Sequence, residues 1–582
     1  MTEPIVRVAG LTKVFRSYRR EEGPAAAGAR TAGGSRAVLL LAALTALALL
    51  PFAGKAFHID DPLFLKAARQ IRAHPLDFYG FSVNWYGTEQ PMWQVMKNPP
   101  LASYFIALVT VIAGENETAL HLAFLVPAIA AILGTYVLAR RLCAHPLAAA
   151  LATLFCPAFL VSSTNVMCDT LLLAFWVWAI ELWLRGIDGG RPGTLAAAAL
   201  LVSLAALTKY FGVALVPLLF AHGVARTRRI GTWALPLLVP VLALAGYQLG
   251  TEALYGQGLL SNAAAYAGGI RFRSGILLFP KAVVGLSFAG GCLASVAFFA
   301  PWLWSGRALA FAGIAGAVLA GALVLARRLG PLSLTDAHGV RWAPVVQLAV
   351  LAVAGAGVLA LAFADLARRR DPGAVLLFLW VAGTFLFTLF FNWAVNARSL
   401  LPVAPAAGIL IARRLDALPG LLRGPRLFPT LSVGAAAALA LLLAAADERL
   451  ANSARTAALR LTGGAALRGT LWFQGHWGFQ HYMEAHGARP LDWRRSRLSV
   501  GDRVAIPIDN ANVVALPADA VVHREAFDVA VLPFLATMNP RLGAGFYLDD
   551  WGPLPFAFGR VPPEHSVLLE LVREVPPGEL TP

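Results

Sequence analysis

Two adjacent carboxylates, Asp60 and Asp61, follow the first strongly apolar stretch of the sequence. Ionisable residues beside the membrane-spanning segments of an apolar chain indicate a functional site. One carboxylate could act as a general base toward an acceptor hydroxyl, or the pair could hold a divalent cation. Asp61 with Pro62 is also an ordinary helix start, in which the aspartate caps the helix and the proline occupies its first turn. Both interpretations can hold together, with Asp60 catalytic and Asp61 capping.

Two further candidate positions, the basic Lys97 and the acidic Asp169, lie later in the chain. Lys97 and Asn98 precede two prolines that would start a short helix, and the positive end of that helix beside an ammonium suits a phosphate. A lysine that reaches toward the membrane surface is the alternative. Asp169 precedes an uninterrupted apolar helix, either as its cap or as a carboxylate facing Asp60. Asp60 and Asp169 are therefore the candidate metal ligands. Together with Asp61 they are also the candidate catalytic carboxylates.

The remaining candidates are side chains that suit an anion. Lys209 and Tyr210 lie in a turn between two short apolar segments, where an ionisable residue indicates function by default. Arg271, Arg273 and Arg398 carry guanidinium groups, whose paired donors match phosphate oxygens. Anchoring at the membrane interface is the competing explanation for all of them. The predicted phosphate-binding set is Lys97, Lys209, Tyr210, Arg271, Arg273 and Arg398.

A cluster of ring-bearing side chains lies near the C-terminus, in the segment GHWGFQHYMEAHG. His476, Trp477, Tyr482 and His486 could bind a metal or a sugar. Packing of an aromatic turn is the favoured interpretation, because no carboxylate stands at ligand spacing from the histidines.

Composition identifies the kind of protein that must position these residues. Of 582 residues, 58% are hydrophobic and only 14% are charged, which is typical of an integral membrane protein. The net charge of +16 arises largely from short loops between apolar segments, so we expect positive-inside topology and contact with a lipid bilayer, and no nucleic-acid partner. The four cysteines have neither disulfide-framework nor zinc-ligand spacing.

The apolar segments predict a mainly α-helical, polytopic fold with about thirteen transmembrane helices. A short apolar stretch at 100–113 is excluded as re-entrant or interfacial, because counting it would invert most basic loops. All candidate residues then fall on the outer side, and only the Arg327–Arg328 loop fits poorly. The expected spans are 37–53, 118–138, 146–164, 170–185, 194–208, 210–223, 232–250, 276–304, 308–326, 344–366, 373–391, 399–415 and 427–446.

The chain is expected to have three parts. Residues 1–36 form a basic cytoplasmic tail, and residues 37–446 form the transmembrane domain, with a first outer loop at 54–117. Residues 447–582 are more polar and form a periplasmic α/β domain, with strands at RVAIPID, NVVALP and DVAVLPF and a helix that ends at Gly487.

In this order, these residues resemble a GT-C membrane glycosyltransferase of family 39, the protein O-mannosyltransferases, or family 83, the aminoarabinose transferases that act on lipid A. The resemblance covers roughly residues 40–420. It is carried by the acidic pair, the Pro-Pro-Leu turn, Asp169, the Leu-Thr-Lys turn and the segment NARSLLP. It implies that Asp60 is the catalytic carboxylate and that Lys209 and the arginines hold a phosphate leaving group. Asn98 stands where many relatives carry Lys or His, so the role of Lys97 and any metal site remain open.

The resemblance also implies a reaction. A sugar would pass, with inversion, from a polyprenyl-phosphate carrier to a periplasmic protein, lipid A or another glycan, at a bacterial inner membrane. A divalent cation is a possible cofactor. The alternatives are a transporter or lipid flippase, a polysaccharide polymerase or ligase, and a scaffold that anchors the C-terminal domain. A transporter would be expected to show internal repeats and ionisable residues at the midplane.

Overall fold

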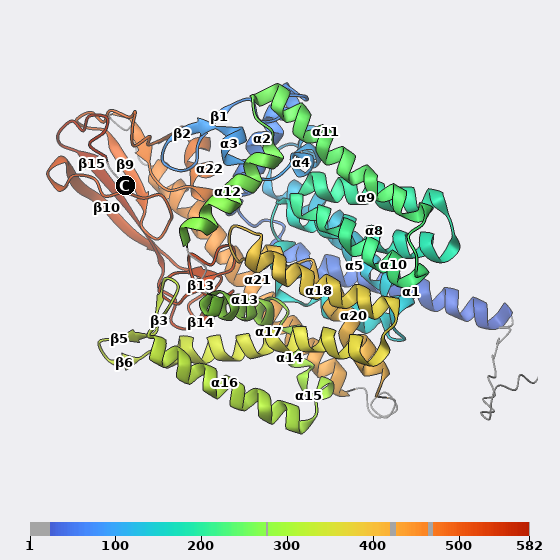
Figure 1. The fold of residues 1–582 in the computed structure, drawn as a ribbon. Coiled ribbons are helices and arrows are strands. Elements are labelled where there is room, and N and C mark those ends of the chain that lie inside the picture. Colours follow the sequence, from blue (N-terminus) through green and yellow to red (C-terminus); the bar gives the residue numbers. More distant parts are fainter. Residues whose placement is uncertain (1–23, 275–277, 419–426, 464–468, 581–582) are drawn as a thin grey trace, which may run out of the picture.

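The computed structural model describes residues 24–274, 278–418, 427–463 and 469–580. Helices make up most of the chain up to Thr462, and the larger β-sheet lies in the residues that follow. Figure 1 shows this sheet, in orange and red, at one end of the helix bundle, beside helix α12 (Leu259–Ser274) and the strands β1 (Ser82–Asn84) and β2 (Glu89–Pro91). The prediction of a mainly α-helical chain with a C-terminal α/β region is confirmed.

Nine helices in the described residues are long and apolar enough to cross a membrane, which makes the chain a multi-pass membrane protein. They coincide with nine of the thirteen expected spans. These helices are Gly34–Phe52, Glu117–Leu142, Cys168–Gly189, Tyr210–Thr227, Thr232–Tyr255, Gly306–Ala326, Trp342–Arg369, Pro372–Phe390 and Thr430–Thr462.

The other four expected spans are short or broken, so the count of thirteen stays a prediction. Residues 146–164 form two helices, α6 (Pro146–Leu154) and α7 (Pro157–Ser162), and residues 399–415 form the end of α19 (Ala397–Leu400) and most of α20 (Val403–Asp416). Residues 276–304 contain α13 (Leu278–Cys292), α14 (Ser295–Phe298) and α15 (Ala300–Leu303), and residues 194–208 belong to α9 (Pro192–Thr208). Prolines at or near most of these breaks interrupt the backbone hydrogen bonding of a helix, which an average of hydropathy does not register.

The first outer loop carries its own small elements. Helix α2 (Asp61–Ala73) is amphipathic and buries one face, and α3 (Met92–Val95) follows the β1–β2 hairpin. Helix α4 (Leu101–Ala113), the segment excluded as a span, is a short apolar helix that packs against α2. The loop therefore forms a folded layer over the end of the bundle.

The segment between two of the long helices contains the basic loop that fitted the expected topology poorly. Between α16 (Gly306–Ala326) and α17 (Trp342–Arg369) the chain forms two short hairpins, β3–β4 (Arg328–Leu329 with Leu332–Ser333) and β5–β6 (Thr335–Asp336 with Gly339–Val340). Arg341 donates a hydrogen bond to the backbone oxygen of Arg541 at 2.6 Å. This contact holds the loop with Arg327 and Arg328 at the end of the bundle where the C-terminal domain lies.

The C-terminal region is built on a five-stranded sheet with the order β10-β15-β9-β7-β8. Three strands are antiparallel, β10 (Val521–Val529), β15 (Glu564–Leu571) and β9 (Arg503–Pro507), and β7 (Leu471–Phe473) and β8 (Arg489–Pro490) continue the sheet in parallel. The expected RVAIPID strand is β9 and the start of DVAVLPF ends β10, but NVVALP is not a strand. Helix α22 (Trp477–Ala485) ends before Gly487, and α21 (Leu427–Thr462) continues past residue 446 into this region.

Candidate active site

A cavity of about 720 Å³ lies where the first outer loop, the ends of several bundle helices and the C-terminal domain meet. Five of the nine predicted site residues line it. They are Asp60, Lys97, Lys209, Tyr210 and Arg398. Side chains separated by hundreds of residues in the chain thus share one chamber at the same end of the bundle.

Asp60 stands at the N-cap position of α2, where its side chain makes no capping hydrogen bond. Its Oδ2 atom accepts a hydrogen bond from Nη1 of Arg398 at 2.9 Å. The Arg398 guanidinium also lies 5.6 Å from the ring centre of Tyr547. Burial lowers the pKa of Arg398, but the carboxylates of Asp60 and Asp169 outweigh that effect and raise it above its usual value. Arg398 therefore stays charged and holds one oxygen of Asp60.

Asp61 points away from the cavity and is completely buried. Its two oxygens accept hydrogen bonds from the backbone N–H groups of His58, at 2.8 Å, and of Val166, at 2.9 Å. Burial raises the pKa of Asp61 to about 7, although the two N–H groups and Lys55 oppose this. Asp61 thus ties the loop that carries Asp60 to the bundle.

Asp169 and Lys209 form a pair. Asp169 is the second residue of α8 (Cys168–Gly189) and is 2% exposed, while Lys209 lies between α9 and the 3-10 helix η2 (Tyr210–Ala214) and reaches the cavity. Nζ of Lys209 donates to Oδ1 of Asp169 at 2.7 Å. Asp169 orients the lysine, and it does not itself line the cavity.

Lys97 lies on the opposite wall, near α12. Its Nζ donates to Oδ1 of Asn262 at 2.6 Å and lies 5.0 Å from the ring centre of Tyr266. Burial lowers the pKa of Lys97 to about 8. The hydroxyl of Tyr79 donates to the backbone oxygen of Asn98 at 2.8 Å and fixes the turn. Arg271 and Arg273 belong to the end of α12, but their side chains lie outside the described residues.

Cationic and apolar side chains line different parts of the cavity wall. The cationic side chains Lys97, Lys209 and Arg398 come from three separate elements. Apolar side chains of α12 and of α18 (Pro372–Phe390) with the residues just after it cover another part of the wall. These are Leu260, Ala263, Ala264, Ala267, Phe387, Phe391 and Trp393. A chamber of this kind suits an amphiphile whose anionic group meets the cations while its apolar part lies along the helices.

The C-terminal domain closes the cavity with the aromatic cluster, including His476 and Trp477. The His476 ring packs edge-on against Trp85, with centroids 4.9 Å apart, and burial lowers its pKa to about 4. Trp477 has a left-handed backbone with φ of 64°, and Ile59, beside Asp60, has φ of 46°. Such conformations are strained for large side chains and cluster at functional sites. His476 and Trp477 are therefore packed among aromatic rings and also line the cavity.

A buried ion-pair network beneath the cavity was not singled out from the sequence. Nζ of Lys55 donates to Oδ2 of Asp447 at 2.6 Å and to Oδ1 of Asn165 at 2.7 Å. The hydroxyl of Tyr547, which lines the cavity, donates to the same Asp447 oxygen at 2.7 Å, and Thr537 donates to the other at 2.9 Å. The available signal was that Lys55 and Asp447 each stand at the end of an apolar stretch of the sequence.

The predicted metal pair does not form a donor set. Asp60 is hydrogen bonded to Arg398 and Asp169 to Lys209, so each carboxylate already has a cationic partner. Within residues 24–274, 278–418, 427–463 and 469–580, no cluster of three or more histidine, cysteine or acidic side chains could hold a metal ion. We therefore assign no metal to these two residues.

Residues 97–248 match the family model described as dolichyl-phosphate-mannose-protein mannosyltransferase. Three similar solved structures have low identity and TM-scores below 0.5. The oligosaccharyltransferase AglB of Archaeoglobus fulgidus is 14% identical with a TM-score of 0.47, over 79% of this chain and 64% of that one. ArnT of Cupriavidus metallidurans, bound to undecaprenyl phosphate, is 16% identical with a TM-score of 0.39, over 81% and 93%. The Pmt1–Pmt2 complex of S. cerevisiae is 16% identical with a TM-score of 0.30, over 38% and 34%.

No curated protein sequence matches the chain. The chain spans less than two thirds of the length of the AglB chain that it resembles. The matched segment includes four predicted site residues, Lys97, Asp169, Lys209 and Tyr210. Over residues 97–248, the chain is therefore similar to the protein mannosyltransferase family.

Proposed function

We propose that the protein is a membrane glycosyltransferase that transfers a sugar from a polyprenyl-phosphate carrier to a hydroxyl of an acceptor, with inversion. One observation carries this proposal. A carboxylate, Asp60, faces the same cavity as Lys97, Lys209 and Arg398, and an apolar wall adjoins them. The family match over residues 97–248 supports a lipid-phosphate donor of the family 39 kind.

Asp60 is the general base in this mechanism. Oδ2 is hydrogen bonded to Arg398, which leaves Oδ1 for the acceptor hydroxyl. As the acceptor oxygen attacks the anomeric carbon, its proton passes to Asp60 and the bond from that carbon to the phosphate oxygen breaks. The phosphate leaves as an anion, and fixed cations where charge develops lower the barrier. Lys209, held by Asp169, and Arg398 supply these charges, while Lys97 binds the phosphate from the α12 side.

The proposed setting is a bacterial inner membrane, with the N-terminus in the cytoplasm and the cavity and C-terminal domain in the periplasm. The basic loops favour this orientation. An exported sugar has no access to cytoplasmic nucleotide sugars, so a lipid carrier must deliver it. The acceptor is a protein, lipid A or another glycan.

The test is transfer of radiolabelled sugar from a panel of polyprenyl-phosphate sugars, with purified protein and a membrane extract as acceptor. Wild type is expected to label one fraction of the extract, which identifies the acceptor class. Asp60→Asn and Lys209→Ala are expected to lower transfer by about 10²-fold or more, as loss of a general base or of a preorganised charge does.

Two controls make the result specific. Arg460→Ala removes an exposed cation of the C-terminal region that lies outside the cavity, and it should transfer sugar at the wild-type rate. Chelation by EDTA should leave the rate unchanged, because cationic side chains already bond both carboxylates of the predicted metal pair. Equal transfer by wild type and Asp60→Asn would refute the site, and no transfer from any lipid-phosphate sugar would refute the function.

A further inference from the structure

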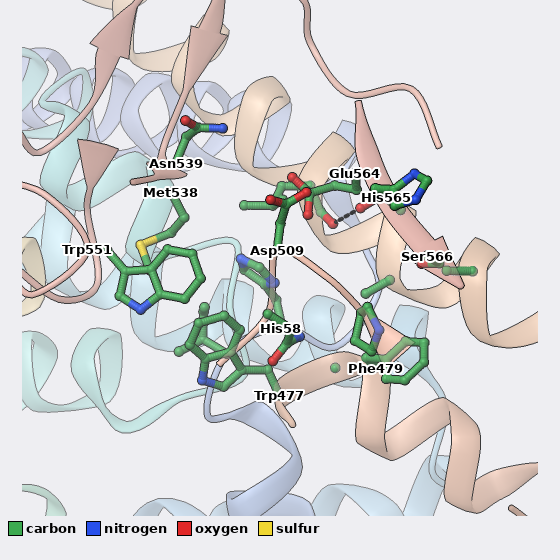
Figure 2. Close-up of a pocket in the computed structure, with 18 of the residues that line it drawn as sticks. His58, Trp477, Phe479, Asp509, Met538, Asn539, Trp551, Glu564, His565 and Ser566 are labelled. Carbon is green, nitrogen blue, oxygen red and sulfur yellow. Dashed lines mark hydrogen bonds between the residues drawn. The ribbon is translucent and has the colours of Figure 1, made fainter. Parts of the chain in front are cut away.

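A second, smaller pocket of about 50 Å³ lies on the C-terminal side of the cavity. The two hollows share wall residues, namely Ile59, Trp477, Met538 and Trp551. Ile59 directly precedes Asp60, so a group held in the pocket lies close to the proposed base. Figure 2 shows the pocket with His58 and Trp477 on one side and Asp509 and Glu564 on the other.

The carboxylates of Asp509 and Glu564 define the charge of this pocket. Both residues are half-buried, and in the described part of the chain neither carboxylate accepts a hydrogen bond. The nearest cation to Asp509 is Arg541, at 4.0 Å, and the Arg541 side chain is 72% exposed. Burial, together with the charge of Asp509, raises the pKa of Glu564 to about 8. Glu564 is therefore largely protonated at neutral pH, and a bound cation would favour its carboxylate form beside Asp509.

The remaining walls suit a small cation. Trp477 and Trp551 lie with ring centroids 5.2 Å apart and inclined by 50°, and the face of an indole ring attracts an ammonium. His58 is 4% exposed, and its ring lines the pocket. Nε2 of His58 lies 3.7 Å from Oδ1 of Asp447, a carboxylate outside the pocket, and burial lowers the pKa of this histidine to about 4, so its ring is a neutral part of the wall.

The volume of the pocket decides between a small ammonium group and a sugar ring as its ligand. Aromatic and carboxylate side chains together also suit the face and hydroxyls of a sugar ring. A space of about 50 Å³ holds a few non-hydrogen atoms rather than a hexose. The amide oxygen of Asn510 already accepts the backbone N–H of His476 at 3.1 Å, and that of Asn539 accepts the backbone N–H of Leu542 at 3.0 Å, so both amide oxygens already have a donor.

We propose that this pocket binds a primary ammonium group carried by the acceptor. Its carboxylates would take the N–H donors, and the two indole rings would cover the charge. The amine anchors the acceptor on the C-terminal side and directs a neighbouring hydroxyl past Trp477 and Trp551 toward Asp60. This assignment to the acceptor rests on the proposed transferase function, in which the cations of the large cavity bind the phosphate of the donor.

Binding of small amines to the full-length protein in detergent tests the pocket without any donor. The probes are methylamine and ethanolamine, with methanol and ethylene glycol as their neutral counterparts, and binding is followed by ligand-observed NMR. Both amines are expected to bind and both neutral compounds to fail. Asp509→Asn combined with Glu564→Gln should weaken amine binding by about tenfold or more, as loss of charge-assisted hydrogen bonds predicts. Glu574→Gln, an exposed carboxylate of the same domain, should bind like wild type.

Thermal unfolding separates a binding role from a structural one. Replacing the two carboxyl groups with amides should leave the Tm unchanged or raise it, because burial and the charge of Asp509 already disfavour the ionised form of Glu564. A lowered Tm together with lost binding would show that the carboxylates stabilise the fold and would overturn the proposal. Equal binding of amines and neutral compounds, or no binding of either, would also overturn it.

Kinetics then tests the link to transfer. In the double variant, the KM for the natural acceptor should rise while the KM for the donor stays constant. Amine binding in a protein that transfers no sugar would sustain the pocket and refute the transferase function. Transfer with an unchanged acceptor KM would sustain the transferase and refute the pocket's role.

Discussion

Asp60 and Asp61 are neighbours in sequence, yet each has its own chemical role at the residue scale. Asp60 lines the cavity, whereas Asp61 is buried and accepts two backbone N–H groups. We expect Asp60→Asn to lower kcat without changing the Tm. Asp61→Asn should lower the Tm, because an amide oxygen replaces only one of two acceptors and leaves a buried N–H unpaired, at a cost of about 1–3 kcal/mol. Transfer rates and thermal unfolding of both variants check this, and a stable, inactive Asp61→Asn would contradict it.

Lys97 offers a pH-dependent test at the same scale. Burial disfavours its ammonium form and lowers the pKa to about 8, so the charge is present below pH 8 and is lost as the pH rises through that value. If Lys97 binds the donor phosphate, the donor KM should rise between pH 7 and pH 9, by up to about tenfold if the neutral form binds weakly. Lys97→Arg keeps its charge over this range, and its donor KM should stay flat. A rise of equal size in the variant would assign the titration to another group.

At the scale of the elements, the loop that carries Asp60 depends on a close approach to α22. A side chain at Gly478 would place its Cβ 2.1 Å from the backbone oxygen of Phe57. Gly478→Ala must therefore displace either the 55–60 loop or the start of α22, and overpacking of this kind costs about 1–3 kcal/mol. We expect a lower Tm and slower transfer. Gly246→Ala, in α11 (Leu238–Tyr255) with open space around it, is the matched control and should be neutral or stabilising. Equal Tm values for the two variants would contradict the close approach.

The elements also show how far the sequence could predict this molecule. Hydropathy predicted the nine long apolar helices, because an uninterrupted run of about 20 apolar residues has few other structures available. It could not distinguish continuous helices from pairs such as α6 and α7, whose break lies at Phe155 and Cys156, just before Pro157. The sequence placed the candidate residues at helix ends on one side, and five of them, Asp60, Lys97, Lys209, Tyr210 and Arg398, line one cavity in the structure.

Which candidates face the cavity depended on contacts that no local pattern contains. Asp61 accepts the backbone N–H groups of His58 and Val166, and Asp169 is turned toward Lys209. Residues of the second pocket, Asp509 and Glu564, lie on separate segments of the C-terminal domain and meet only in the folded chain. The positions of charged residues predicted which end of the bundle carries the site, but tertiary packing determines which of these residues line the cavity.

For the whole molecule, the buried pair of Lys55 and Asp447 joins the first outer loop, the last membrane helix and the C-terminal domain, since Tyr547 also donates to Asp447. Both charged side chains are 0% exposed. Removing one partner of such a pair costs about 3–5 kcal/mol, whereas replacing both with apolar residues is often far less harmful. Lys55→Met should therefore lower the Tm strongly and expose the C-terminal domain to proteolysis, and adding Asp447→Leu should restore part of the loss.

The matched control for this prediction is Arg524→Met. It breaks the exposed pair with Glu570 inside the C-terminal sheet and should change the Tm little, because exposed ion pairs contribute little. If Lys55→Met proved as stable as this control, the buried pair would not hold the three parts together. If the double variant proved stable but slow, with normal donor and acceptor KM, the pair would act by fixing the loop that presents Asp60. Stability and kcat measured together on the three variants therefore separate assembly of the molecule from alignment of its base.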